Sequence, residues 1–108
     1  MFMVIVNHWC KAGMMDRARK RLDTNGELMA GRPGFLYRHR LETPKEPNRL
    51  STVTAWVDEA SYKSWDAWKK ARDAAAGPDA ELSASLLFEK AENLQFHVAL
   101  SHEPALQP

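Results

Sequence analysis

The residues best suited to chemistry gather around one expected strand-to-helix junction. Trp56 ends an alternating, β-branched stretch, and Asp58 and Glu59 then break the alternation and suit the first turn of a helix. Three more rings follow at spacings of three, so they share one face of that helix: Tyr62, Trp65 and Trp68. Large rings at such a corner serve either as a core anchor or as the wall of a pocket for a flat hydrophobic molecule.

Polar side chains that could act beside these rings lie on the first expected strand and late in the aromatic helix. Asn7 is unexpected, because an amide is disfavoured inside a β-branched strand and needs a partner where it is buried. His8 follows it, and it is either a base or a surface or interface histidine. The candidate catalytic residues are Asn7, His8 and Trp65, and the candidate substrate-binding residues are Trp56, Tyr62, Trp68 and Arg72.

Two arginines, Arg38 and Arg40, share one face of the second expected strand. They pair with Glu42 or with a second copy of the chain, or they bind an anionic group of a substrate, and we favour pairing. The single cysteine, Cys10, excludes an intramolecular disulfide and a cysteine-based zinc cage. We therefore expect no metal site.

Length and composition describe an ordinary single domain. The chain has 108 residues, 44% of them hydrophobic and 27% charged, and we expect one domain over 1–108 with a core of about 2–100 and a tail over 101–108. The net charge of +1 gives no reason to expect nucleic acid or an anionic membrane as a partner. No stretch approaches the roughly 20 apolar residues of a membrane span, so a cytoplasmic location is the default expectation.

Hydrophobic periodicity predicts the order β-α-β-β-α-(α)-β. We expect helices between Gly13 and Gly31, weakened at Asn25-Gly26, and over 59–76, with weak helical character over 79–93. Strands are expected over 2–10, 35–42, 50–57 and 95–100. This order predicts an α+β, ferredoxin-like split βαβ fold, with helices on one face of a four-stranded antiparallel sheet. The first and third strands are apolar on both faces, so a second copy should cover the open face and form a homodimer.

Several of these segments resemble the antibiotic biosynthesis monooxygenase superfamily, the dimeric α/β barrels. The matching parts are the opening strand with Asn7, Gly13, the turn over 32–35, the stretch over 52–62, and Trp65. The resemblance extends over about residues 2–76 plus the last strand. It implies a pocket between the sheet and the second helix, with Asn7 close to Trp65.

The cofactor-independent branch of this superfamily implies a pocket that binds an aromatic, polycyclic or quinol-type molecule and lets its anion reduce dioxygen. The protein then supplies a base, a cation or amide for the enolate oxygen, and a dry cavity. Small aromatic substrate and dioxygen are the expected partners, and no cofactor is expected.

Two alternatives stay open. The haem-degrading branch has an Asn on the first strand, a Trp on the second helix and an axial His later on that helix. Asn7 and Trp65 match, but the position of the histidine falls in Asp73–Ala76, which contains none. Haem is therefore the alternative cofactor. The third hypothesis is a non-catalytic dimer that binds a small ligand.

Overall fold

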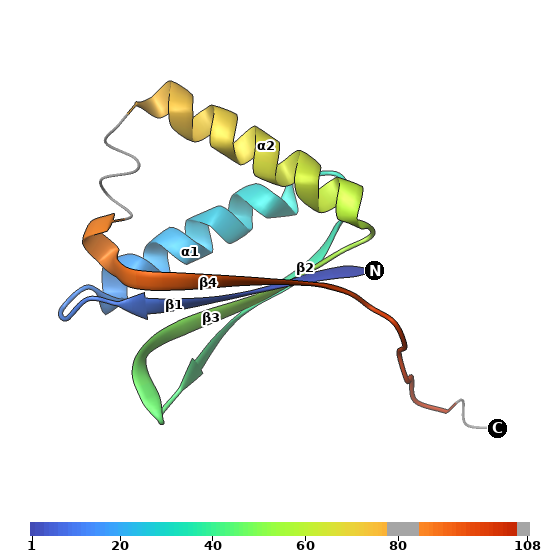
Figure 1. The fold of residues 1–108 in the computed structure, drawn as a ribbon, viewed down its shortest axis with the longest axis horizontal. Helices are drawn as coiled ribbons and strands as arrows, with labels where there is room; N and C mark the ends of the chain where they lie inside the picture. Colours follow the sequence, from blue (N-terminus) through green and yellow to red (C-terminus); the bar gives the residue numbers. More distant parts are fainter. Residues whose placement is uncertain (78–84, 106–108) are drawn as a thin grey trace.

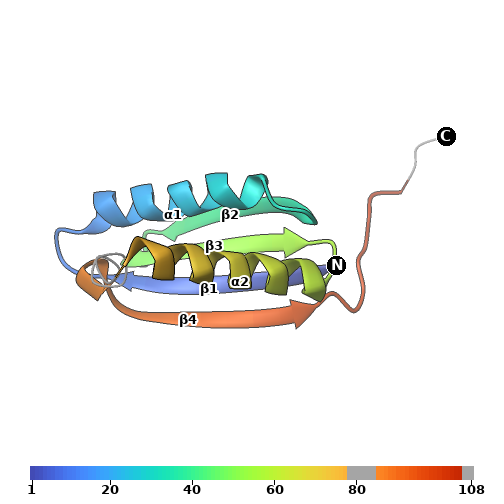
Figure 2. The same ribbon diagram turned by 90° about the horizontal axis from the view of Figure 1, so that it is seen from above.

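The structure, a computed structural model that describes residues 1–77 and 85–105, places the helices α1 and α2 on one face of an antiparallel sheet (Figures 1 and 2). Four strands form the sheet in the order β2-β3-β1-β4. This is the ferredoxin-like arrangement predicted from the sequence. The elements are β1 (Phe2–Cys10), α1 (Met15–Ala30), β2 (Phe35–Thr43), β3 (Glu46–Trp56), α2 (Glu59–Ala76) and β4 (Phe88–His97).

The helix α1 packs on the sheet through the apolar stripe that the sequence predicted. Ala18, Leu22 and Met29 are buried, and they recur at spacings that place them on one side of the helix. The helix continues through Gly26 without a break, although a glycine in a helix interior costs about 1 kcal/mol relative to alanine. The side chain of Arg38, on β2, packs directly against Gly26.

The helix α2 starts at a capped end. The Asp58 carboxylate accepts a hydrogen bond from the Ser61 backbone N–H at 2.8 Å and so satisfies one of the free donors of the first turn. Gly77, with φ +89°, ends the helix. Trp65 is the residue of α2 that is buried, at 5% exposure, and it therefore anchors the helix on the sheet.

The turn between α1 and β2 packs against the start of α2 through Gly34. This residue has φ +82°, and a Cβ there would lie 2.1 Å from the Ser61 hydroxyl oxygen. Its carbonyl accepts a hydrogen bond from the Val57 N–H at 2.8 Å. Glycine therefore lets three segments meet at the strand-to-helix corner that carries the aromatic residues.

Two buried clusters fill the space between helices and sheet. One joins the start of β1 and the end of β3 to both helices, and its members are Phe2, Val4, Met29, Trp56 and Trp65. The other lies at the opposite end of β1, under α1: Cys10, Ala18, Leu22 and Leu50. The aromatic residues of the corner thus lie in the first cluster.

The starts of two strands differ most from the sequence prediction, and β4 also ends at His97 rather than at Leu100. The strand β3 begins at Glu46 rather than at Leu50, because the prolines at 44 and 47 lie in and beside a tight hairpin turn instead of a long loop. The strand β4 begins at Phe88, so the helical pattern expected over 79–93 is wrong from that residue on. Residues 85–87 are helical, and 78–84 lie outside the described residues.

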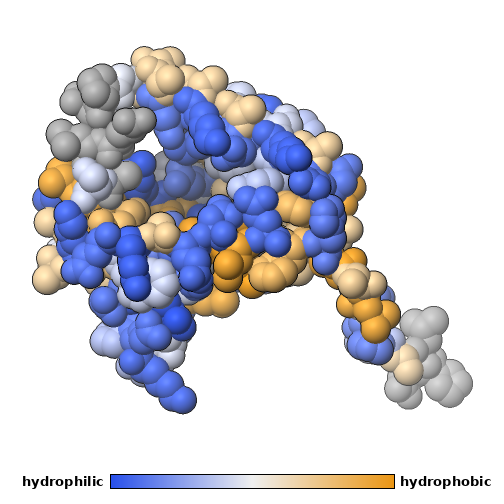
Figure 3. Space-filling model, in the orientation of Figure 1, coloured by the Kyte–Doolittle hydropathy of each residue, from blue (hydrophilic) through white to orange (hydrophobic). Residues whose placement is uncertain are grey.

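The sheet face away from the helices is largely apolar. Strand pairing brings Ile5 beside Val53 and Leu94 on this face. Figure 3 shows hydrophobic side chains gathered along that side of the sheet. Several large apolar side chains there are exposed: Tyr37 (39%), Leu41 (50%), Leu94 (38%) and Phe96 (47%). No helix in the described part of the chain is long and apolar enough to span a membrane.

Candidate functional site

A small cavity lies between the first half of α2 and the sheet. Its volume is about 130 Å³, close to that of a protein cavity of about 150 Å³ known to hold benzene. Its volume therefore matches that of one aromatic ring. Its lining consists of Val4, Val6, Met29, Arg38, Thr54, Trp56, Tyr62, Trp65, Asp66 and Asn93.

Three of the predicted aromatic residues meet in this cavity. The ring of Trp56 is fully buried and lies 6.4 Å from that of Trp65 at an interplanar angle of 27°, which is a stacked arrangement. The ring of Tyr62 lies 6.3 Å from that of Trp56 at 62°. The indole N–H of Trp56 is buried and has no hydrogen-bond acceptor among the described residues. The cavity thus offers flat apolar walls.

A partly buried guanidinium contributes to the cavity lining on the side of β2. Arg38 donates to the Thr54 hydroxyl (3.4 Å), the Leu22 carbonyl (3.3 Å) and the Met29 sulfur (3.3 Å), which are all neutral acceptors. Burial lowers the pKa of Arg38 to about 10, and the negative charge of Asp23 partly opposes this. Arg38 therefore remains a cation at neutral pH, with no carboxylate hydrogen-bonded to it within the described ranges.

Two backbone features place Arg38 in this position. The register between β2 and β3 shifts between Phe35 and Tyr37, so Phe35 and Arg38 both lie on the helix side although three positions separate them. On α1, a Cβ at Gly26 would lie 3.3 Å from Cδ of Arg38. Gly26 therefore leaves space for the arginine side chain to pass between helix and sheet.

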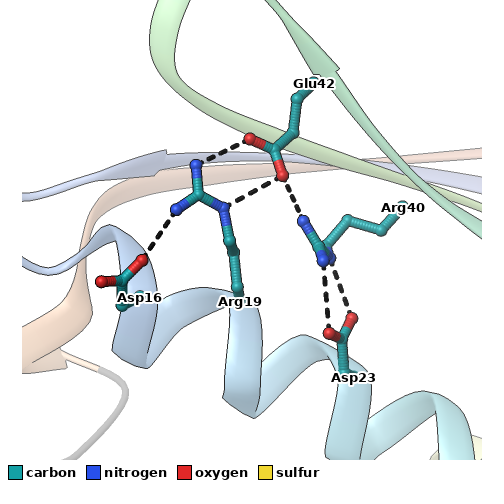
Figure 4. A network of polar contacts seen from close by, with 5 residues as sticks. All are labelled: Asp16, Arg19, Asp23, Arg40 and Glu42. Carbon is teal, nitrogen blue, oxygen red and sulfur yellow. Dashed lines mark hydrogen bonds and ion pairs between the residues drawn. The ribbon is translucent and has the colours of Figure 1, made fainter.

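The neighbouring Arg40 behaves as the sequence analysis favoured for both arginines. It pairs with Asp23 at 2.9 Å and with Glu42, which also binds Arg19 at 2.8 Å (Figure 4). Asp16 extends this network through Arg19 at 2.9 Å. The favoured interpretation is confirmed for Arg40 and is wrong for Arg38, whose guanidinium donates to the Thr54 hydroxyl, the Leu22 carbonyl and the Met29 sulfur instead of a carboxylate.

The expectation that Asn7 faces Trp65 is wrong. Asn7 pairs in register with Ser51 and Glu92, and side chains of paired residues point to the same side of a sheet. Its amide accepts from the Ser51 hydroxyl at 2.6 Å and donates to Glu92 at 3.1 Å. Asn7 therefore lies on the open face, while Val6 takes the position toward α2.

His8 faces the helices but does not line the cavity. Its Nδ1 lies 3.3 Å from the Leu50 carbonyl oxygen, and its ring packs on Phe88 at 4.8 Å. Burial lowers the pKa of His8, the contact with the Leu50 carbonyl raises it, and the charge of Arg38 lowers it. The neutral imidazole thus packs in the second cluster, away from the aromatic corner.

Trp68 and Arg72 lie on the outer side of the aromatic group. The ring of Trp68 packs on that of Trp65 at 5.7 Å, and the guanidinium groups of Arg32 and Arg72 lie 4.8 and 5.6 Å from its centre. These are cation–π contacts at the surface of the helix layer. Neither residue lines the cavity, and their expected part in substrate binding stays a prediction.

The sequence analysis missed Thr54, Asp66 and Asn93 as cavity residues and misplaced Arg38. Asp66 lies next to Trp65 in the chain, pairs with Lys70 at 2.8 Å and keeps 42% of its side chain exposed. Thr54 is two residues from Trp56, so strand alternation placed it on the same face as that ring. Asn93 lies in β4, in a segment for which the sequence predicted weak helical character, so its place beside the cavity was not predicted.

A second, larger hollow does not have the same character. It measures about 510 Å³, is open to solvent, and lies at the end of the sheet beside the start of α2. Its titratable groups are already paired, since His97 contacts Glu59 at 3.1 Å and Glu59 contacts Lys63 at 3.1 Å. We therefore place the candidate site at the enclosed aromatic cavity.

The sequence and the fold agree with one family. The family model described as antibiotic biosynthesis monooxygenase matches residues 1–77, which is more than half of the chain. The chain belongs to this family. No curated protein matches its sequence.

Solved structures of this family share the fold at low sequence identity. A candidate antibiotic biosynthesis monooxygenase from Nitrosomonas europaea is 13% identical with a TM-score of 0.72, and the match covers 93% of this chain and 100% of the other. SnoaB, a cofactor-independent oxygenase from Streptomyces nogalater, is 16% identical with a TM-score of 0.65 and coverage of 93% and 95%. A variant of MhuD with manganese protoporphyrin IX bound is 23% identical, with a TM-score of 0.66 and coverage of 96% and 100%.

Haem does not fit the cavity of this family member. A volume of about 130 Å³ is that of one ring rather than of a porphyrin, and α2 contains no histidine. His8, the histidine of β1, is held by the Leu50 carbonyl and Phe88. Residues 1–77 and 85–105 also contain no group of three His, Cys, Asp or Glu side chains that could hold a metal ion.

Proposed function

We propose that this protein is a cofactor-independent monooxygenase that oxidises a one-ring phenol or hydroquinone in the cavity between α2 and the sheet. The observation that carries the proposal is the partly enclosed aromatic cavity of about 130 Å³ with a partly buried cation, Arg38, in its lining. Family membership and the SnoaB-like fold support an oxygenase reaction without a bound cofactor. The cavity volume favours one ring over the polycyclic substrates considered from the sequence.

The reaction balances without any other reductant. A hydroquinone and dioxygen yield a hydroxyquinone and water, so one oxygen atom enters the ring and the other leaves as water. The substrate supplies all four electrons, and its deprotonated form is the electron donor. The protein then has to bind the ring, stabilise the anion and exclude bulk water.

Each of these tasks has residues in the lining. Trp56, Tyr62 and Trp65 hold the ring between flat walls, and Arg38 stabilises a negative oxygen. Asp66 is the carboxylate of the lining. We propose that it acts as the base that accepts the proton of the second hydroxyl as the ring is oxidised. These roles are our proposal for residues that the cavity brings together.

The working protein in this proposal is a homodimer built on the open face of the sheet. The exposed apolar side chains of β2 and β4 support this, because a single chain rarely leaves such a face to water. A second copy would bury the Asn7, Ser51 and Glu92 network in the interface. Asn7 then has a role in assembly rather than in the cavity.

Dioxygen consumption tests the proposed reaction. Protein freed of metal and haem should accelerate oxygen uptake by methylhydroquinone above the rate without protein. Replacing Trp65 by Phe removes part of the cavity wall, and we expect at least a tenfold lower rate with the fold retained, as judged by circular dichroism. If oxygen uptake with wild-type protein is no faster than autoxidation without protein, the proposal is contradicted. The remaining hypothesis is then a non-catalytic dimer that binds a ligand.

A further inference from the structure

The lining of the cavity has a buried end and an exposed end. Five of its members are at most 9% exposed: Val4, Met29, Thr54, Trp56 and Trp65. The side chain of Asp66 is 42% exposed, and Asn93 is exposed as well. Asp66 comes from α2 and Asn93 from β4, the edge strand of the sheet (Figure 2). The cavity therefore opens to solvent between this helix and this strand.

Four residues border this opening, and we call them the rim: Tyr62 and Asp66 of α2, and Asn93 and Gln95 of β4. We propose that the rim recognises a neutral carbonyl group carried by a one-ring substrate, with Asn93 as the residue that determines this specificity. The inference deepens the proposed function, on which it rests, by naming a substituent of the substrate. The substituent is a ketone, an ester or an amide.

Strand pairing places both β4 residues of the rim on the helix side of the sheet. Asn93 lies beside Val6 and Gln95 beside Val4 in the pairing of β1 with β4. Paired residues point to the same side of a sheet, and Val4 belongs to the buried cluster between sheet and helices. The Gln95 side chain reaches α2, since its amide nitrogen donates to the Tyr62 hydroxyl at 3.4 Å. The substituent of a bound ring would thus pass between these side chains.

The hydrogen bonds of the rim leave a donor free at Asn93. The amide nitrogen of Gln95 donates to Oδ1 of Asn93 at 3.0 Å, so the carbonyl side of the Asn93 amide is occupied. Nδ2 of Asn93 makes no hydrogen bond within residues 1–77 and 85–105. The Tyr62 oxygen accepts from Gln95, which leaves its own O–H to donate. These free donors select an acceptor, such as a carbonyl oxygen, over an alkyl group.

The charges of the rim favour a neutral acceptor over an anionic one. Asp66 is the carboxylate of the rim, and it pairs with Lys70 at 2.8 Å. The pair is neutral as a whole, so it offers an anionic substituent no net attraction. A carboxylate of the ligand would also lie beside the carboxylate of Asp66. A ketone, ester or amide provides the acceptor oxygen without this charge.

Acetophenone and ethylbenzene test the inference, because they have nearly the same size and differ in the carbonyl oxygen. Neither is a hydroquinone, so NMR titration measures their binding apart from any turnover. The decisive quantity is the ratio of their dissociation constants, compared between wild type and Asn93→Leu. We expect the variant to weaken acetophenone relative to ethylbenzene roughly threefold to tenfold, which is the contribution of one hydrogen bond.

Three further variants locate the effect. Asn93→Asp keeps the size of the side chain, replaces the donor by a negative acceptor, and should lose at least as much of the preference for acetophenone. Gln95→Leu should lower the same preference with the affinity for ethylbenzene unchanged, because Gln95 is a positioning residue for the Asn93 amide. Glu92→Gln is the matched control, since Glu92 precedes Asn93 on the opposite face of β4, and it should keep the wild-type ratio.

The outcomes separate this inference from the proposed function. A ratio that is the same in wild type and in both Asn93 variants overturns carbonyl recognition and leaves a ring-binding oxygenase in place. Binding of neither probe by wild-type protein overturns both, because the cavity then does not admit a ring. A preference for acetophenone that is lost in the Asn93 variants, without accelerated oxygen uptake by methylhydroquinone, supports the rim and contradicts the oxygenase.

Discussion

At the residue scale, two arginines two positions apart on one strand have opposite environments. Arg40 lies at the surface among carboxylates, whereas Arg38 lies in the buried layer among neutral acceptors. The difference comes from the depth of each position, since Gly26 of α1 leaves room for the Arg38 side chain. A partly buried cation without a hydrogen-bonded carboxylate costs stability, and the role proposed for Arg38 toward a substrate anion would account for this cost.

His8 makes stability depend on pH. Burial lowers its pKa below the ordinary 6.5, so the unfolded chain takes up the proton first as pH falls. Stability from the neutral ring is present above pH 6.5 and is lost as pH falls from 6.5 toward the pKa in the folded protein. His8→Gln should remove this loss, so the free energy of unfolding in urea should differ less between about pH 7.5 and about pH 5.5 than it does in wild type.

His102→Gln is the control for that comparison, because His102 is exposed in the C-terminal segment. It should leave the pH dependence as in wild type. A pH dependence that is the same in His8→Gln and wild type contradicts the environment described for His8.

At the element scale, periodicity in the sequence predicted most of the fold. The first strand, the aromatic helix and the buried stripe of α1 are all confirmed, since each is a strong and local pattern. The start of β4 was missed, because Phe88 is followed by polar residues on an edge strand whose side chains are largely exposed. The strand β4 forms by pairing with β1, and its sequence lacks the alternation of apolar and polar residues that predicts a strand.

The site was predicted in part for a similar reason. Ring spacing on α2 and alternation on β3 brought Trp56, Tyr62 and Trp65 together correctly. The side of Asn7 was wrong because a family resemblance, and not alternation, assigned it. Alternation along β1 places Val4 and Val6 toward the helices and Asn7 away from them. For Arg38 the sequence analysis favoured pairing over binding of an anionic group, because the packing of Arg38 opposite Gly26 of α1 depends on tertiary structure.

Gly34 should be the glycine that tolerates substitution least at the aromatic corner. Gly34→Ala combines φ +82° with a Cβ 2.1 Å from the Ser61 hydroxyl oxygen, so backbone and α2 must both shift. We expect a loss of more than about 2 kcal/mol in the free energy of unfolding, measured with urea. Gly31→Ala is the control, since its Cβ would meet the Leu28 carbonyl oxygen at 3.7 Å and should cost far less.

At the scale of the whole molecule, the protein has one covered and one open sheet face. The helices bury the site on one side, and the apolar open face accounts for the proposed dimer (Figures 2 and 3). Dimers of this obligate kind commonly bury more than roughly 2,000 Å². The site and the dimer face thus use opposite sides of the same strands, so each can be altered separately.

Phe96→Asp should weaken the dimer. Phe96 is 47% exposed on the open face of β4, so the variant can fold, but a carboxylate in the interface would be left without a partner. Light scattering at micromolar concentration should show dimers for wild type and mainly monomers for the variant. Val57→Asp, at a 52% exposed apolar residue beyond β3, should stay dimeric. A monomeric wild-type protein contradicts the proposed assembly.

The most direct test of the central claim is the fate of labelled dioxygen. Metal-free and haem-free protein is given methylhydroquinone under ¹⁸O₂, and the product is analysed by mass spectrometry after separation. We predict a hydroxyquinone that carries one labelled oxygen atom, formed at least tenfold more slowly by Arg38→Met because the phenolate then lacks its cation. Product that forms only at the rate of the protein-free reaction, or that carries no label from dioxygen, contradicts a cofactor-independent monooxygenase in this cavity.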